Sequence, residues 1–380
     1  MTLASIRVSR FVPFAATALV ALAGLAIAGP LTPPSGPVAS SYKTLGEVEP
    51  RIALSLANTP GDADSIFKIT ARGSYYLTGN VTGVAGKHGI EIAASNVTID
   101  LEGYSLIGVA GSLDGIRTTT LSLPNITIEH GVVSDWRNSG IDLVSQSAVG
   151  SVVRDIRAHN NGVGGSFSGI RVHNHSLIED CISSQSSAYG FDIYANCRVV
   201  NCVARSNGSN GFDSASQTSY SGCNSFANGG IGIRTDGSSS VLDCTASQNV
   251  GAGISVTDGS LVSRCVAGMN ASGIVLQGKS TAIGNTCRSN QSAGIHVVTG
   301  SDNRIEENHC VSNVTGIIVA TPSNLIVKNT CASNTLNWSI IANNVYGPII
   351  DRTTAVTPAV NGNAAAAAIG TTDPNANFTY

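Results

Sequence analysis

The side chains best suited to chemistry in this sequence are charged residues that recur two positions after a glycine. In chain order this column reads Glu91, Arg117, Asp142, Arg171, Asp192, Asp213 and Arg234, and then Ser255, Val275, His296 and Ile318. Four positions after the glycines of the same middle region lie His173, Tyr194 and Asp236. Alternate residues of an extended chain point to one face, so both sets of side chains would share a surface.

The central members of this surface are the predicted site. We predict as catalytic residues Asp192, Asp213, Arg171 and Tyr194, and as substrate-binding residues Asp142, His173, Arg234 and Asp236. Asp192 and Asp213 would be like charges about 5 Å apart, which is unfavourable unless a cation, a shared proton or an arginine compensates. Acid/base chemistry and Ca²⁺ binding both use such a pair. We predict no metal site and no resident cofactor, and Ca²⁺ stays open as a ligand of the aspartates.

Three activities and one structural role fit this surface. Glycoside hydrolysis needs two carboxylates about 5 to 9.5 Å apart, which the aspartates could supply. A polysaccharide lyase would hold Ca²⁺ on aspartates and use Arg171 or Tyr194 as the base, and sugar epimerisation is the third activity. In the structural alternative, the aspartates and arginines form ion pairs between strands that keep an exposed sheet soluble, each worth a fraction of a kcal/mol.

An internal repeat indicates which elements position these side chains. Glycine followed by isoleucine or phenylalanine occurs at Gly89, Gly115, Gly140, Gly169, Gly190, Gly211, Gly232, Gly253, Gly273, Gly294 and Gly316. Cysteines keep nearly the same period, at Cys181, Cys202, Cys223, Cys244, Cys265, Cys287, Cys310 and Cys331. Asparagines follow five residues after the cysteines of the middle coils and three residues after the later ones. Three ladders in phase indicate a stack of similar coils of about 21 residues.

Within each repeat the sequence alternates between apolar and polar residues. Gly253-Ile254-Ser255-Val256 is an example, and this period of two is typical of strands. Three short strands and three turns fit one repeat. Stacking such coils would place equivalent strands about 4.8 Å apart in parallel sheets. The sequence therefore predicts an all-β solenoid of about 11 coils.

The repeat also resembles a known family. Gly-Ile-x-Val units alternating with Asn-x-Cys units, such as Asn285-Thr286-Cys287, are similar to the right-handed parallel β-helix repeats of the pectate-lyase-like superfamily. The resemblance covers residues 89–336 and implies a right-handed parallel β-helix. The chain is similar to secreted bacterial β-helix proteins of unassigned activity.

A shorter resemblance lies inside the predicted site. Tyr189-Gly190-Phe191-Asp192 resembles the start of the Tyr-Gly-Phe-Asp-Pro-His motif of mannuronan C5-epimerases, which implies catalytic positions for Tyr189 and Asp192. Ile193-Tyr194 replaces Pro-His, and Ala215 stands where the family has an acidic residue one coil later.

The segments around the repeat predict export. Arg7 and Arg10 precede an apolar stretch that ends in Ala26-Ile27-Ala28, so residues 1–28 are predicted to be a cleaved signal peptide, with an uncleaved anchor as the alternative. Residues 29–88 are predicted to be a linker and N-terminal capping segment, 89–336 the β-helix, and 337–380 a C-terminal cap or tail. The predicted location is secreted or in the cell envelope, without a membrane span after signal removal.

Composition narrows the partners. The net charge is −3 and only 12% of residues are charged, with no run of lysine and arginine, so we exclude nucleic acid. We predict that the cysteines of the repeat form a stacked ladder of buried thiols, because in-register side chains lie too far apart for disulfides, whereas Cys197 falls outside the register and is either free or part of one bridge. The resemblance to the pectate-lyase-like superfamily implies a polysaccharide partner, which the protein would bind and, as an enzyme, would process. The alternative is a non-catalytic cell-surface, adhesion or spacer module, and the oligomeric state stays open.

Overall fold

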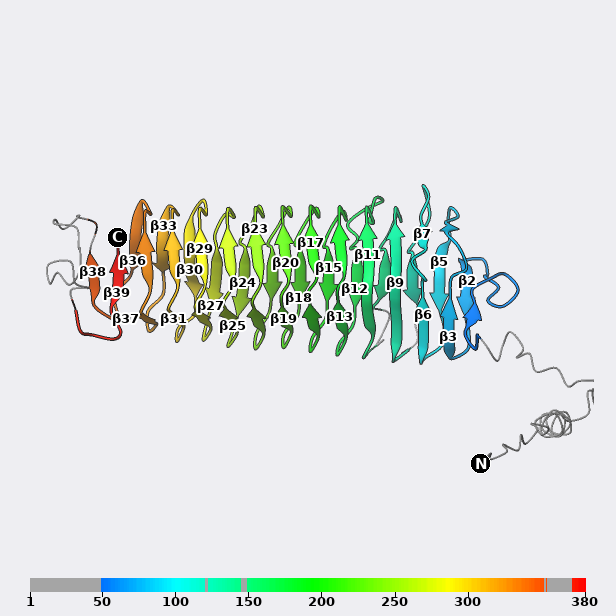
Figure 1. Cartoon of the computed structure of the whole chain (residues 1–380), viewed down its shortest axis with the longest axis horizontal. Coiled ribbons are helices and arrows are strands. Elements are labelled where there is room, and N and C mark those ends of the chain that lie inside the picture. The colour runs from blue at the N-terminus through cyan, green and yellow to red at the C-terminus, as the bar shows by residue number, and fades with distance from the viewer. Residues whose placement is uncertain (1–48, 120–121, 145–148, 352, 354–370) are drawn as a thin grey trace, which may run out of the picture. The chain divides into compact units, whose positions relative to one another are not determined.

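A computed structural model describes residues 49–119, 122–144, 149–351, 353 and 371–380. The predicted signal peptide and most of the predicted linker lie outside these residues. Residues 51–380 form one unit, in which the described part is all-β, without helices. Figure 1 shows its strands stacked coil upon coil in one row. The predicted β-helix fold is confirmed.

The strands form two parallel sheets. Sheet B has 13 strands, β2 (Ser65–Ile69), β5 (His88–Ile92), β8 (Ile116–Thr118), β10 (Ile141–Leu143), β12 (Ile170–Val172), β15 (Phe191–Ile193), β18 (Phe212–Ser214), β21 (Ile233–Thr235), β24 (Ile254–Thr257), β27 (Ile274–Gln277), β30 (Ala293–Thr299), β33 (Thr315–Val319) and β36 (Leu336–Ile340).

Sheet A has 26 strands, because most coils contribute two. They are β1 (Ile52–Ala53), β3 (Gly73–Tyr76), β4 (Val81–Thr82), β6 (Val97–Asp100), β7 (Ser105–Ile107), β9 (Ile126–Ser134), β11 (Val152–His159), β13 (Leu177–Glu179), β14 (Ile182–Ser184), β16 (Arg198–Val200), β17 (Val203–Arg205), β19 (Ser219–Ser221), β20 (Asn224–Phe226), β22 (Ser240–Leu242), β23 (Thr245–Ser247), β25 (Leu261–Ser263), β26 (Val266–Gly268), β28 (Thr281–Ile283), β29 (Thr286–Arg288), β31 (Arg304–Glu306), β32 (His309–Val311), β34 (Leu325–Val327), β35 (Thr330–Ala332), β37 (Val345–Tyr346), β38 (Ile349–Asp351) and β39 (Asn377–Thr379).

The predicted number of about 11 coils is too low, since sheet B has 13 strands. The two additional strands, β2 and β36, lie at the ends of the sheet and lack the Gly-Ile pattern. The registers place Ile66 and Asn337 where the eleven inner strands have their glycine. Residues before 89 and after 336 therefore contribute to the same sheet, and the last strand, β39, pairs with β35 and β38.

The recurrent glycine is explained by close contact between coils. A Cβ atom at Gly253 would lie 2.8 Å from the carbonyl oxygen of Gly273 and 2.6 Å from Nδ2 of Asn270. The same clash with the next coil recurs at the other inner coils. At Asn337 no following coil is present among the described residues, so this constraint does not apply there.

The recurrent asparagines form a buried ladder. Asn207, Asn228, Asn249, Asn270, Asn290, Asn313 and Asn334 lie at one turn of successive coils. In the first six, the side-chain Nδ2 donates to Oδ1 of the asparagine one coil further on, at 2.8 to 3.4 Å. In the last six, Oδ1 also accepts the backbone N–H of the preceding asparagine. The ladder thus satisfies buried backbone groups that the turn leaves without a sheet partner.

All nine cysteines are buried and unbridged, as predicted for those of the repeat. Eight of them form two columns, however, so the prediction of a single ladder is wrong, and Cys197 lies in neither column. The first column lies in a turn and passes from Cys265 to Asn285, whose Oδ1 accepts the Cys265 N–H at 2.9 Å. The second begins at Cys287, which lies in β29 opposite Ala267. This shift explains why the asparagine follows the later cysteines by three residues instead of five.

Candidate functional site

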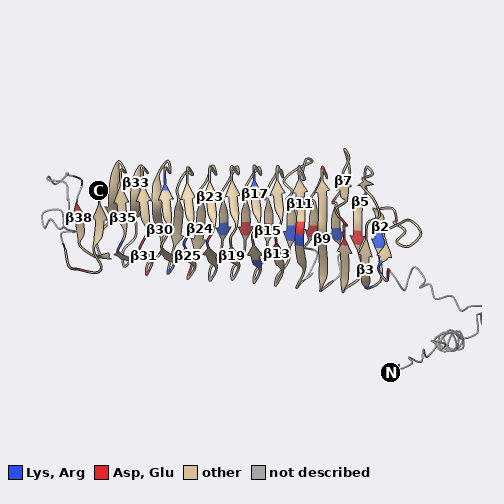
Figure 2. Cartoon of the chain, in the orientation of Figure 1, with Lys and Arg blue, Asp and Glu red and all other residues tan. Residues whose placement is uncertain are grey.

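The predicted charged column lies in register on the outer face of sheet B. Cα partners run from Lys68 and Glu91 through the whole column to Ser255. Figure 2 shows the blue and red segments of this sheet gathered on its N-terminal half. The fold therefore brings the eight predicted site residues to one face.

Arg171 connects two of the predicted aspartates. Its Nη1 lies 3.0 Å from Asp142 Oδ2, and its Nε lies 2.8 Å from Asp192 Oδ2. Burial lowers the pKa of Arg171, but both carboxylates outweigh this effect and raise the pKa above its usual value. Burial raises the pKa of Asp142, against the opposing charge of Arg171.

Asp213 has its own partners, so the like charges on adjacent rungs are compensated. Arg234 Nη1 lies 2.7 Å from Asp213 Oδ1, and Asn210 Nδ2 donates to Asp213 Oδ2 at 3.0 Å. Arg234 Nη2 also reaches Asp236, at 2.9 Å. The arginine beside each of these aspartates is thus one of the compensations that the sequence allowed.

Five of the predicted residues line one pocket of about 270 Å³, which we call the tyrosine pocket. Its lining consists of Tyr189, Asp192, Ile193, Tyr194, Asp213, Ser214, Ala215, Arg234 and Asp236. Burial and the neighbouring Asp213 raise the pKa of Tyr189. The ring of Tyr194 is stacked on His173 with centroids 4.7 Å apart. Burial and His175 lower the pKa of His173. The pocket combines aromatic surface with fixed carboxylates and a guanidinium.

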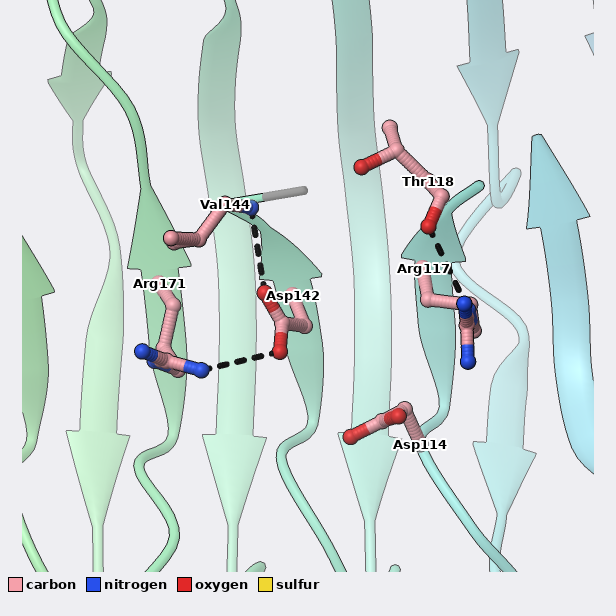
Figure 3. A pocket seen from close by; sticks show the side chains of 6 residues that line it. All are labelled: Asp114, Arg117, Thr118, Asp142, Val144 and Arg171. Carbon is pink, nitrogen blue, oxygen red and sulfur yellow. Dashed lines mark hydrogen bonds and ion pairs between the residues drawn. The ribbon is translucent and has the colours of Figure 1, made fainter. Parts of the chain in front are cut away.

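A second pocket of about 270 Å³ lies nearer the N-terminal end of the same face, and we call it the arginine pocket. It is lined by Asp114, Arg117, Thr118, Asp142, Val144 and Arg171. Figure 3 shows the Asp142–Arg171 pair on one side and Arg117 with Asp114 on the other. Asp142 and Arg171 thus line the arginine pocket and not the tyrosine pocket. The sequence analysis missed Asp114, since it precedes the repeat glycine and falls in neither charged column.

The long insertion before β12 does not form a wall of either pocket. Val163 and Gly164 of this insertion line a different pocket of about 400 Å³, together with Val109, Asp135 and Arg137. Residues 162–168 therefore line neither pocket of the charged face.

Both tryptophans are packed in the fold. Trp136 is fully buried and donates from Nε1 to the carbonyl oxygen of Leu106 at 3.1 Å. Trp338 packs against the core at the last strand of sheet B and donates from Nε1 to Thr379 Oγ1 at 2.7 Å. The described aromatic surface of the candidate site therefore comes from tyrosines.

Parallel coils, two sheets and an unbroken core make this chain a parallel β-helix repeat protein, and the resemblance seen in the sequence is confirmed. A family model described as "Periplasmic copper-binding protein (NosD)" matches residues 193–363. The periplasmic description of that family agrees with the predicted location. No curated protein sequence matches the chain. No described helix is long and apolar enough to cross a membrane.

Solved structures share the fold at low identity. The A-module of the Azotobacter vinelandii mannuronan C-5 epimerase AlgE6 is 14% identical, with a TM-score of 0.56 over 73% of this chain and 91% of that module. Gene product 12 of bacteriophage phi29, in its pre-mature form, is 13% identical, with a TM-score of 0.50 over 71% of this chain and 49% of that protein. At such identities the likeness establishes the fold alone.

The residues in the matched range do not fit a copper centre. Copper prefers thiolate, thioether and imidazole ligands. The described cysteines are buried in interior columns, and burial raises the pKa of Cys197 to about 11. Among the described residues, three candidate ligand atoms meet only at Asp100, Glu129 and His130, which lie outside residues 193–363. We therefore derive no chemistry through copper.

Proposed function

We propose that this protein binds polysaccharide on the outer face of sheet B, with the tyrosine pocket as the main contact. The observation that carries the proposal is the pocket lining. Tyr194 offers an amphipathic ring, and Asp192, Asp213 and Arg234 offer fixed acceptors and donors. Concave sites with aromatic surface and a few placed polar groups are typical of small-ligand recognition, and sugars suit both kinds of contact.

The name of the AlgE6 module supports a carbohydrate ligand, because that protein is a mannuronan C-5 epimerase. Processing of the bound polysaccharide would use Asp192 and Asp213. Asp213 is held by Arg234 and Asn210, whereas Asp192 has a partner on Oδ2 and none on Oδ1 among the described residues. Asp192 is thus the freer acid/base group, with Arg171 positioning it and Tyr194 beside it.

The alternative is a non-catalytic surface, adhesion or spacer module. Two observations favour it. The aspartates of the face are paired with arginines, as in an ion-pair ladder that keeps an exposed sheet soluble. The insertion at 162–168 lines a different pocket and neither of the two pockets on this face.

A polysaccharide screen separates these functions. Purified protein would be tested against acidic and neutral polysaccharides, with and without Ca²⁺, for binding and for new reducing or unsaturated ends. We expect binding that falls about tenfold in Tyr194→Ala and is unchanged in Tyr346→Ala, an exposed tyrosine of β37 in sheet A. Products that disappear in Asp192→Asn would establish an enzyme. Absence of binding across the panel would leave the spacer function.

A further inference from the structure

Arg117 differs from the other arginines of the charged face. Arg171 and Arg234 each lie within 3.0 Å of two carboxylates. The carboxylate that Arg117 approaches is that of Glu91, whose Oε2 lies 4.0 Å from Arg117 Nε. Glu91 is already paired through Oε1 with Lys68 Nζ, at 2.7 Å. The charge of Arg117 is therefore the least neutralised on this face.

Uncharged groups hold this guanidinium in place. Arg117 Nε donates to the carbonyl oxygen of Thr118 at 3.2 Å, and Nη1 lies 2.9 Å from His88 Nε2. On the other side of the ring, His88 Nδ1 accepts the backbone N–H of Asp114 at 3.0 Å and lies 3.1 Å from Asp114 Oδ2. His88 and Asp114 are both more than nine-tenths buried, so this support is built into the fold.

The support leaves much of Arg117 available. Two of its five N–H donors have partners among the described residues, and the other three have none. The carboxylates that share the pocket are engaged elsewhere. Asp114 lies against the His88 ring and accepts the backbone N–H of Ser139, and Asp142 accepts from Arg171 and the backbone N–H of Val144.

We propose that Arg117 binds the carboxylate of a sugar acid in the arginine pocket, so that the polysaccharide of the proposed function is an acidic one. A fixed guanidinium with free donors matches a carboxylate with two parallel hydrogen bonds. A hydroxyl on the same sugar can donate to Asp142 across the pocket (Figure 3). The volume of about 270 Å³ lies just below the usual range for drug-sized ligands, about 300 to 1,000 Å³, and suits one sugar unit.

The proposal rests on polysaccharide binding, and its test separates the two. Binding of short oligouronates and of their carboxyl-reduced counterparts would be measured by calorimetry for the wild type, Arg117→Gln and Arg264→Gln. Arg264 is the matched control, since it forms an exposed ion pair with Asp243 at 2.7 Å in the turns that follow β25 and β22. Charge-assisted hydrogen bonds predict a loss of roughly tenfold to hundredfold for the oligouronate in Arg117→Gln, and no change for the reduced ligand.

Each other outcome has a distinct meaning. Equal binding of both ligands by the wild type, or an unchanged oligouronate affinity in Arg117→Gln, would overturn the role of Arg117 and leave polysaccharide binding standing. Binding of neither ligand would refute the proposed function and this inference together. Arg117→Lys keeps the charge and loses the fork geometry, so it should bind the oligouronate more weakly than the wild type and serves if Arg117→Gln does not fold.

Discussion

Replacing one asparagine of the buried ladder should destabilise the β-helix strongly. Asn249 Oδ1 accepts the backbone N–H of Asn228 at 3.1 Å and its Nδ2 at 2.9 Å. Its own Nδ2 donates to Asn270 Oδ1 at 3.1 Å. Asn249→Ala leaves the buried backbone N–H of Asn228 unsatisfied, which costs about 1–3 kcal/mol, and removes two more hydrogen bonds, at about 1 kcal/mol each, whose remaining groups keep another partner. We expect a loss of about 3–5 kcal/mol in the free energy of unfolding, once the small cavity is included.

The assay is urea denaturation followed by circular dichroism, with Asn224→Ala as the control. Asn224 lies in the coil of Asn228, one coil before that of Asn249, and its side chain is exposed on β20. Its replacement should therefore change the free energy of unfolding by less than about 0.5 kcal/mol. Hydrogen exchange at the Asn228 amide should accelerate in Asn249→Ala. A loss below about 1 kcal/mol, or equal effects of both variants, would refute the view that the ladder supports the turn.

Three further predictions follow from the core and the charged face. Gly253→Ala should lower the free energy of unfolding in urea by about 1–3 kcal/mol, because its Cβ meets the next coil. Gly79→Ala, which has open space around it, should not, and equal effects of the two variants would contradict the packing argument. Ellman's reagent should find no rapidly reacting thiol in the native protein and nine in denaturant, and a fast native reaction would show an exposed cysteine. The folded pKa of Asp142 is raised by burial, so the stability that its protonated form provides is lost as the pH rises through that pKa. The stability of Asp142→Asn relative to that of the wild type should therefore increase as the pH rises from about 4 to 7. A relative decrease over this range would contradict the direction of the pKa shift.

Much of the fold follows from the sequence because one coil repeats the contacts of the next. The glycine at Gly253 and its equivalents must avoid the carbonyl of the following coil, so the constraint reappears in every inner repeat. The last strand of sheet B, β36, escaped the prediction for the same reason, since Asn337 has no described coil after it. The division of the cysteines into two columns was missed because Cys287 keeps the sequence period while it moves two residues along the coil.

The candidate site was predictable where it follows the repeat and not elsewhere. Counting from the glycines placed Arg171, Asp192 and Asp213 on adjacent strands, as the registers show. The ion pairs could not be predicted by counting from the glycines, because they depend on the length and burial of the side chains. His88 and Asp114 support Arg117 from outside the column, and their contact joins residues 26 positions apart in neighbouring coils, which no local pattern indicates.

Hydrogen–deuterium exchange with a bound polysaccharide tests the central claim most directly. The account predicts that binding slows exchange in peptides covering residues 189–194 and 210–215, which contain the tyrosine pocket, and leaves the sheet A strands β19 and β20 unchanged. Protection confined to sheet A, or no protection in the presence of any polysaccharide, would contradict it.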